Sequence, residues 1–188
     1  MRSTDRQYFR DMYRESDDPW NFATSEYEER KYAMTLSALP LRRYANAFEP
    51  GCSIGVLSEL LAERCDRVLS TDIVDVALEQ ATSRVAHLGN VRIERRPIPE
   101  KWPRESFDLI VMSELAYHFD LPTLDEILGL VVDTTATGAH LVGVHWRGVT
   151  NYPLSAHGVH RRINRCTKLR RVVHLLDENF LLDVWERV

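Results

Sequence analysis

The spacing of hydrophobic positions changes along the chain, and this change predicts where helices and strands occur. Near the start, Tyr8, Phe9, Met12 and Tyr13 recur at the spacing of one helix face. Residues 25–39 form a second helical pattern, in which Ser25 and a glutamate three residues later make a capping box. The N-terminal part of the chain is therefore expected to contain two helices.

From residue 44 onward, apolar runs typical of strands alternate with amphipathic patterns typical of helices. The expected strands are 44–49, 67–73, 91–96, 107–115, 139–146, 168–176 and 180–188. The expected helices between them are 54–61, 75–89, 121–138 and 155–166. Gly89 is expected to end the second of these helices in a left-handed conformation, and Gly138 to lie past the end of the third.

Alternating strands and helices predict βαβ units and a parallel sheet. The last two strands are separated by only Asp-Glu-Asn, which predicts an antiparallel hairpin. The expected fold is α/β: a doubly wound, mostly parallel, seven-stranded, Rossmann-like sheet with an antiparallel C-terminal hairpin. Residues 1–40 would form an N-terminal helical lid and residues 45–188 the core of a single domain.

Composition narrows the class of protein. The 188 residues are 44% hydrophobic and 28% charged, and the net charge of -4 with a pI near 6.0 argues against a nucleic-acid binder. Cys52, Cys65 and Cys166 form no spaced pair, so neither zinc nor a disulfide framework is indicated. No signal peptide or apolar run of membrane-spanning length is recognisable. A cytoplasmic protein that does not enter a membrane is expected.

The stretch EPGCSIG, residues 49–55, follows the first core strand. Ligands of doubly wound sheets bind at the carboxyl ends of the strands, so this loop is expected to line a binding crevice. Dinucleotide-binding loops carry a middle glycine where this chain has Ser53, and a Cβ there would keep a pyrophosphate away. The loop therefore favours a ligand without phosphate, while a plain structural turn and a nicotinamide enzyme stay open as alternatives.

Two carboxylates sharpen the choice of ligand. Asp72 ends the second core strand, 17 residues after Gly55, where a carboxylate accepts hydrogen bonds from ribose hydroxyls. Glu49 ends the first core strand and suits a ligand with a cationic group. S-adenosyl-L-methionine meets these conditions, since it has a ribose and an ammonium group but no phosphate. The expected product is then S-adenosyl-L-homocysteine.

Three segments carry a family resemblance: FEPGCSIGVLSELLAERC, LSTDIVDVALEQA and FDLIVMSELAYHF. They resemble the first, second and fourth motifs of class I S-adenosylmethionine-dependent methyltransferases. The flanking segments DPW…YEERKYAMTLSALP and HWRG…YPLSAHGVHRRI are similar to the methyltransferase family of nodulation protein S, which N-methylates a chitooligosaccharide. The resemblance covers about residues 8–188. It implies an enzyme that methylates a nitrogen or oxygen of a small-molecule acceptor, such as an amino sugar, glycoside or natural-product intermediate.

The resemblance also implies a set of cofactor-binding residues, with Asp72 on the ribose, Ile73 on the adenine and Lys31 at the cofactor carboxylate. The full set is Trp20, Lys31, Glu49, Gly51, Cys52, Ser53, Gly55, Asp72, Ile73, Pro97, Ile98 and Ser113. The chain departs from many relatives at Arg96-Pro97-Ile98, which lacks an acidic residue for the adenine amine. It also has Tyr117-His118 where relatives often have two tyrosines.

Methyl transfer from a sulfonium needs positioning of the acceptor, and a hydroxyl acceptor also needs a base. His118, His145 and Glu114 follow buried strands and are the candidate catalytic residues, as bases, acceptor orienters or amine binders. Each of them has an alternative structural interpretation, as a hydrogen-bonded histidine or a turn-capping carboxylate. The candidate substrate-binding residues are Tyr117, Trp146 and His160.

Two other patterns carry weaker interpretations. His145, His157 and His160 lie near one another in sequence, but no acid or cysteine completes a ligand spacing, so no metal is expected. Residues 161–171 have six basic side chains and no acidic one. A solvated surface is the simpler interpretation of this basic stretch, and a nucleic-acid methyltransferase is an alternative. A non-enzymatic nucleoside-binding module on the same fold also stays open, as does the oligomeric state.

Overall fold

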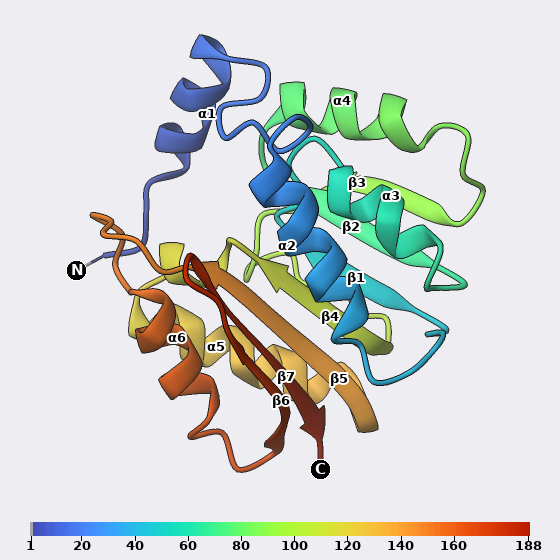
Figure 1. Ribbon diagram of the computed structural model, residues 1–188, viewed down its shortest axis with the longest axis vertical. Coiled ribbons are helices and arrows are strands. Elements are labelled where there is room, and N and C mark those ends of the chain that lie inside the picture. The colour runs from blue at the N-terminus through green and yellow to red at the C-terminus, as the bar shows by residue number, and fades with distance from the viewer. Residues whose placement is uncertain (1) are drawn as a thin grey trace. The chain divides into compact units, whose positions relative to one another are not determined.

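The computed structural model describes residues 2–188, and the chain divides into two compact units. The first unit comprises Asp5–Pro97, and the second comprises Ile98–Val188 together with residues 2–4. Figure 1 shows their helices and strands in chain order, from blue to red.

The first unit consists of two N-terminal helices followed by three strands with two intervening helices (Figure 1). In chain order its elements are α1(Arg6–Glu15), α2(Glu26–Ser37), β1(Ala47–Pro50), α3(Val56–Ala62), β2(Val68–Asp72), α4(Asp75–Val85) and β3(Val91–Arg95). The three strands are parallel, with β2 between β1 and β3. Phe48 is aligned with Leu69, and both side chains are buried. The sheet of this unit therefore has the βαβ order that the alternating pattern predicts.

The Ser25 side chain caps α2 as the sequence predicts, while the backbone N–H of Ser25 donates to the carbonyl of Asn21. The Ser25 hydroxyl accepts a hydrogen bond from the backbone N–H of Glu28 at the start of α2, over 3.5 Å. The prediction for the end of α4 is wrong, because this helix stops at Val85 and Gly89 does not have a positive φ. The N–H of Leu88 bonds to the carbonyl of Val85 and closes a turn before the chain reaches Gly89.

The second unit contains the remaining four strands, two longer helices and one short 3-10 helix, η1 (Figure 1). In chain order its elements are β4(Phe107–Ser113), η1(Ala116–His118), α5(Leu121–Asp133), β5(Thr135–Trp146), α6(Ala156–Ile163), β6(Leu169–Leu176) and β7(Phe180–Arg187). Strands β4 and β5 are parallel, whereas β7 is antiparallel to both β5 and β6. This arrangement confirms the predicted C-terminal hairpin.

Helix α5 is shorter than predicted, because Thr135–Gly138 belong to β5 and not to the helix. The carbonyl of Thr134 accepts a hydrogen bond from the N–H of Phe107, and Thr135 is paired with Phe107 in the sheet. The β-branched Thr135 therefore joins the sheet directly after the helix cap at Thr134. Gly138 has a φ of 89° and lies where the register between β4 and β5 shifts.

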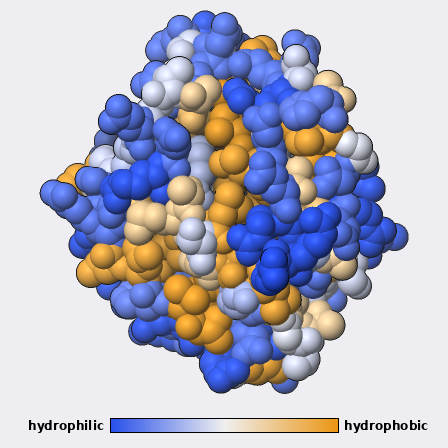
Figure 2. Space-filling view, turned by 45° about the vertical axis from the view of Figure 1, so that its right-hand side comes forward, coloured by the Kyte–Doolittle hydropathy of each residue, from blue (hydrophilic) through white to orange (hydrophobic). Residues whose placement is uncertain are grey.

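The strand order is β3-β2-β1-β4-β5-β7-β6, a seven-stranded mixed sheet with antiparallel C-terminal strands. The predicted fold class is therefore confirmed. Figure 2 shows hydrophobic residues reaching the surface in patches among hydrophilic ones. Among residues 2–188, no helix combines the length and the apolar character needed to cross a membrane.

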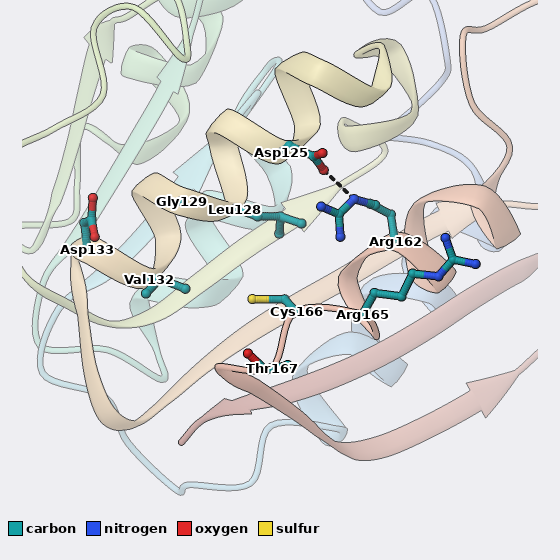
Figure 3. Close-up of a pocket in the computed structure, with 9 residues that line it drawn as sticks. All are labelled: Asp125, Leu128, Gly129, Val132, Asp133, Arg162, Arg165, Cys166 and Thr167. Carbon is teal, nitrogen blue, oxygen red and sulfur yellow. Dashed lines mark ion pairs between the residues drawn. The ribbon is translucent and has the colours of Figure 1, made fainter.

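A groove of about 320 Å³ runs between α5 and α6 (Figure 3). Asp125 on α5 and Arg162 on α6 form an ion pair across it. None of the residues lining this groove belongs to the predicted cofactor, catalytic or substrate sets. The predicted site residues therefore lie elsewhere in the two units.

Candidate functional site

The loop that joins β1 to α3 is built from left-handed backbone conformations. Gly51, Ser53 and Gly55 have φ values of 75°, 51° and 79°. The N–H groups of Gly51 and Cys52 both donate to the carbonyl of Thr71 on β2, over 2.7 and 2.9 Å. The loop therefore turns tightly over the end of the neighbouring strand.

Gly55 is required by close packing as well as by its backbone conformation. A Cβ at this position would lie 2.9 Å from the Cα of Ala81 on α4, closer than real Cβ atoms come. Cys52 is buried below the loop, against Leu78 and Ala81. The loop and α4 are thus packed too tightly for any residue larger than glycine at position 55.

The Asp72 carboxylate lies at the carboxyl end of β2, as predicted, and it holds the loop in place. Its Oδ2 accepts a hydrogen bond from the N–H of Ser53 over 2.9 Å. Its Oδ1 accepts from the N–H groups of Ile73 and Val74, over 2.7 and 3.1 Å. Burial raises the pKa of Asp72, and these three hydrogen bonds oppose that shift. A carboxylate offers about four lone-pair positions, so one further donor can be accommodated.

The Glu49 carboxylate is buried beneath the loop, with 3% of the residue exposed. Its Oε2 accepts hydrogen bonds from the hydroxyls of Ser58 on α3 and Ser70 on β2, the latter over 2.7 Å. Burial raises its pKa to about 7, while the two serine hydroxyls act in the opposite direction. The predicted contact with a cationic ligand group stays a prediction.

Helix α1 packs on the loop through Tyr13, a contact that the sequence did not reveal. The Tyr13 hydroxyl hydrogen-bonds to the hydroxyl of Ser53, and burial raises the pKa of Tyr13. Trp20 packs edge-on against the Tyr13 ring at 5.7 Å between centroids, and Ile73 packs against the same cluster. The structure therefore brings together three predicted cofactor residues, Trp20, Ser53 and Ile73. The only sequence signal at Tyr13 was its place on an apolar helix face.

Lys31 lies on α2 and is only 1% exposed. Its ammonium nitrogen is 2.9 and 2.8 Å from the two carboxylate oxygens of Glu28, and 5.0 Å from the centre of the Tyr27 ring. Pro97 ends the first unit, whereas Ile98 and Ser113 belong to the second. The roles predicted for these four positions stay predictions.

In the second unit, Glu114 follows β4 with a φ of 52°, which is uncommon for a residue other than glycine. Its Oε2 accepts hydrogen bonds from the Tyr117 hydroxyl, over 2.5 Å, and from the backbone N–H of Trp146, over 2.9 Å. Its own N–H donates to the carbonyl of Val144 on β5. The structure thus gathers Glu114, Tyr117 and Trp146 at the carboxyl ends of β4 and β5.

Aromatic rings pack around Tyr117, whose hydroxyl donates to this carboxylate. The Tyr117 ring contacts His118, His145 and Tyr152 with centroids 4.8, 5.1 and 4.9 Å apart. Burial lowers the pKa of His118 to about 4, so its ring is neutral at pH 7. The His118 Nδ1 lies 3.3 Å from the Thr4 hydroxyl. Tyr152 was not predicted, because it lies in a loop without a periodic pattern.

His145 and His160 are buried and bonded to each other. The Nε2 of His145 accepts a hydrogen bond from the N–H of Ala116 over 3.1 Å, and its Nδ1 lies 3.0 Å from the Nε2 of His160. The Nδ1 of His160 lies 2.8 Å from the carboxylate of Asp183. Asp183 was missed, although an acid inside the apolar run FLLDVW is itself a signal, since buried charges need partners.

The histidine pattern and the basic stretch of residues 161–171 both make contacts within the second unit. His157 is 3.4 Å from the guanidinium of Arg147, and no group of three histidine, cysteine or acidic side chains within residues 2–188 is arranged to hold a metal ion. In the basic stretch, Arg162, Arg170 and Arg171 pair with acidic side chains of the same unit. These ion pairs reduce the positive charge that this surface presents to a partner.

Comparisons with known proteins agree with the fold. The family of nodulation protein S (NodS) matches residues 4–142, well over half of the chain. Nodulation protein S of Rhizobium tropici is 31% identical over 129 residues, which cover 68% of this chain and 54% of that protein. The chain spans about half the length of the nodulation protein S relatives it matches, from 49% to 60%.

Two solved structures are similar over most of their length. A Pseudomonas syringae protein, described as a candidate methyltransferase, is 38% identical with a TM-score of 0.77, covering 87% of this chain and 100% of that one. The N-methyltransferase NodS from Bradyrhizobium japonicum WM9, in complex with S-adenosyl-L-homocysteine, is 25% identical with a TM-score of 0.85, covering 97% and 99%. With the family match and the fold in agreement, the chain belongs to the nodulation protein S family.

Proposed function

We propose that this protein is an S-adenosylmethionine-dependent methyltransferase that methylates an amine nitrogen of a small-molecule acceptor. The cofactor binds the first unit, and S-adenosyl-L-homocysteine leaves as the product. The observation that carries the proposal is the pairing of the left-handed loop at Gly51–Gly55 with the Asp72 carboxylate. Membership of the nodulation protein S family supports it.

In the first unit, the geometry suits a nucleoside without a phosphate. The loop amides of Gly51 and Cys52 are already bonded to Thr71, and Ser53 carries a side chain, so the loop offers little to a pyrophosphate. The Asp72 carboxylate is held by three backbone N–H groups and can accept one more donor, such as a ribose hydroxyl. These features favour S-adenosylmethionine over a dinucleotide.

In the second unit, the Glu114 carboxylate suits an amine acceptor. Tyr117 and the amide of Trp146 hold one carboxylate oxygen in place, and the Tyr152 ring packs against the Tyr117 ring. A neutral amine attacks the methyl carbon with its lone pair while the methyl–sulfur bond breaks, and the new ammonium then loses a proton. The carboxylate stabilises the positive charge that develops on the nitrogen. Holding the reactants in line contributes up to about 7–11 kcal/mol in well-oriented cases.

Histidine is less suited to act as the base. The pKa of His118 is about 4, far below a neutral working pH, and both ring nitrogens of His145 are engaged in hydrogen bonds. An amine needs no base before it attacks, whereas a hydroxyl does. The arrangement therefore favours nitrogen as the methylated atom.

Calorimetry with S-adenosyl-L-homocysteine tests the cofactor assignment. Replacing Asp72 with alanine removes a hydrogen bond to a charged group, which costs about 1.5–3 kcal/mol, or roughly a 10- to 150-fold weaker affinity. Asp75→Ala is the matched control, because this aspartate lies three residues further on with 71% of its side chain exposed. Equal affinity of the wild type and Asp72→Ala would refute the ribose assignment.

A screen of amino sugars, glycosides and small amines with labelled cofactor tests the reaction. Transfer of label to an amine, with a raised KM in Glu114→Gln, supports the proposal. Cofactor binding without transfer to any acceptor would favour a non-enzymatic module. Salt-sensitive binding of RNA or DNA would favour a nucleic-acid methyltransferase, which the ion pairs of the basic stretch do not support.

A further inference from the structure

Four polar groups form a continuous hydrogen-bonded line through the interior of the second unit. The line runs from the backbone N–H of Ala116 to His145 on β5, then to His160 on α6 and to Asp183 on β7. Ala116, His145, His160 and Asp183 are 0%, 0%, 2% and 0% exposed. The line therefore connects η1, next to the proposed acceptor site, with a carboxylate on β7, the strand paired with β5.

The two ends of the line determine where the protons lie. A backbone N–H can only donate, so the Nε2 of His145 must be without a proton. Neutral His145 then carries its proton on Nδ1 and donates to the Nε2 of His160. His160 in turn carries its proton on Nδ1 and donates to the Asp183 carboxylate, which can only accept. Both rings are therefore the Nδ1–H tautomer.

Any other proton arrangement breaks the contact with Ala116. A proton on the Nε2 of His160 would face the Nδ1 of His145 and force the His145 proton onto Nε2. That proton would point at the N–H of Ala116, and two donors cannot bond to each other. The carboxylate of Asp183 thus selects the form of His145 that accepts from Ala116.

Asp183 is itself held in its ionised form. Its Oδ1 accepts from the Nδ1 of His174 over 2.6 Å, and the guanidinium of Arg171 lies 3.5 Å from its Oδ2. Burial alone would raise the pKa of Asp183, but the hydrogen bonds from His160 and His174 and the charge of Arg171 lower it. The carboxylate at the end of the line is therefore a stable acceptor.

We propose that Asp183 and His160 are positioning residues for the methyl-acceptor site. Acting through His145, they hold the Ala116 amide and so fix η1 against β5. Glu114 lies two residues before Ala116 and is tied to the same strand, so both anchors set the position of its carboxylate. The expected effect on activity rests on the proposed methyl transfer. The proton arrangement of the two histidine rings can be measured without any turnover.

The first test is nitrogen-15 NMR of the histidine rings in the wild-type protein. The expected result is that His145 and His160 are both neutral with the proton on Nδ1, and that the amide of Ala116 exchanges slowly with solvent. A proton on the Nε2 of either ring would overturn the proposal. This measurement needs neither an acceptor nor turnover, so it stands even if the proposed methyltransferase activity fails.

The second test compares two substitutions at the centre of the line. His160→Phe keeps a ring but cannot accept from His145, whereas His160→Gln has a carbonyl oxygen that can. We expect His160→Phe to lower kcat/KM for the amine acceptor at least tenfold and to speed exchange of the Ala116 amide. We expect His160→Gln to stay within about threefold of the wild type, and affinity for S-adenosyl-L-homocysteine to be unchanged in both.

A second pair of variants, with a stability control, separates loss of positioning from loss of folding. Asp183→Asn retains an oxygen that can accept from His160, whereas Asp183→Leu does not, so only the leucine variant should lose activity. Val159→Ala, at a fully buried position of the same helix, lowers stability without touching the line. If Val159→Ala loses as much activity as His160→Phe, or if the asparagine and leucine variants behave alike, the positioning role is wrong.

Discussion

Gly55 offers the sharpest test of how the candidate cofactor loop is built. Substitutions at three glycines allow the free-energy cost of Gly55→Ala to be separated into a backbone part and a packing part. Gly55 has a φ of 79°, and an added Cβ would lie 2.9 Å from the Cα and 3.0 Å from the Cβ of Ala81. Gly138 also has a positive φ, of 89°, but nothing lies within 4 Å of an added Cβ. Gly89 has neither a positive φ nor a close neighbour. Alanine substitutions at the three positions therefore form a graded series.

The magnitudes follow from these environments. Gly89→Ala should be neutral or stabilising by about 0.4–1 kcal/mol, because alanine restricts the unfolded chain. Gly138→Ala should cost about 1–2 kcal/mol for the left-handed backbone alone. Gly55→Ala adds about 1–3 kcal/mol of overpacking to that backbone cost, giving roughly 2–5 kcal/mol in total. Since the nearest atom is a backbone Cα, shortening the Ala81 side chain should restore only part of this loss.

Urea unfolding at pH 7 measures the free energy of unfolding for the three variants and the wild type. Calorimetry with S-adenosyl-L-homocysteine should show weaker binding for Gly55→Ala and unchanged binding for Gly89→Ala. The reasoning is refuted if Gly55→Ala costs no more than Gly138→Ala, because the close approach of α4 to the loop would then contribute nothing.

Two further predictions concern buried titratable groups. The pKa of Glu49 is about 7 in the folded protein against an ordinary 4.5, so its contribution to stability is complete below pH 4.5 and is lost as the pH rises through 7. Glu49→Gln should therefore stabilise the protein at pH 8 by up to about 3 kcal/mol but not at pH 4. Urea unfolding at the two pH values measures this difference, and equal effects at both would contradict the prediction. The pKa of His118 is lowered from 6.5 to about 4, so its contribution is complete above pH 6.5 and is lost as the pH falls through 4. An NMR titration of the His118 ring should show a midpoint near 4, and a midpoint near 6.5 would disprove its burial as a neutral ring.

The ends of two helices could not be predicted from the local sequence pattern. All seven strands and both N-terminal helices were predicted from periodicity, and the family and fold class were confirmed. The helix predicted for 121–138 is too long because Thr135 pairs with Phe107 and begins β5 directly after the α5 cap at Thr134. Gly89 is a stop signal in the sequence, yet a turn at Val85 ends that helix first. Both errors arise from hydrogen bonds that compete with the helix at its last turn.

The candidate site was predicted unevenly, for a related reason. Asp72 and the glycines of the loop were found because they lie at fixed distances from strand ends, which are visible in the sequence. Tyr13 and Asp183 were missed because their partners, Ser53 and His160, lie 40 and 23 residues away. The histidines at the ends of strands were recognised as site candidates, but their hydrogen-bond partners were not.

The sequence by itself determined the type and order of the elements, the glycine-containing loop after the first core strand and the position of Asp72, because these depend on periodicity and on residues close together in the chain. Only the tertiary structure decided that Glu49 is buried between two serines and that His145 is bonded at both ring nitrogens. A side chain's pKa and proton arrangement depend on burial and on partners brought together by folding. The same residue types at the same spacing lead to the same prediction in any chain. Their pKa values and hydrogen-bond partners depend on the side chains that folding packs around them.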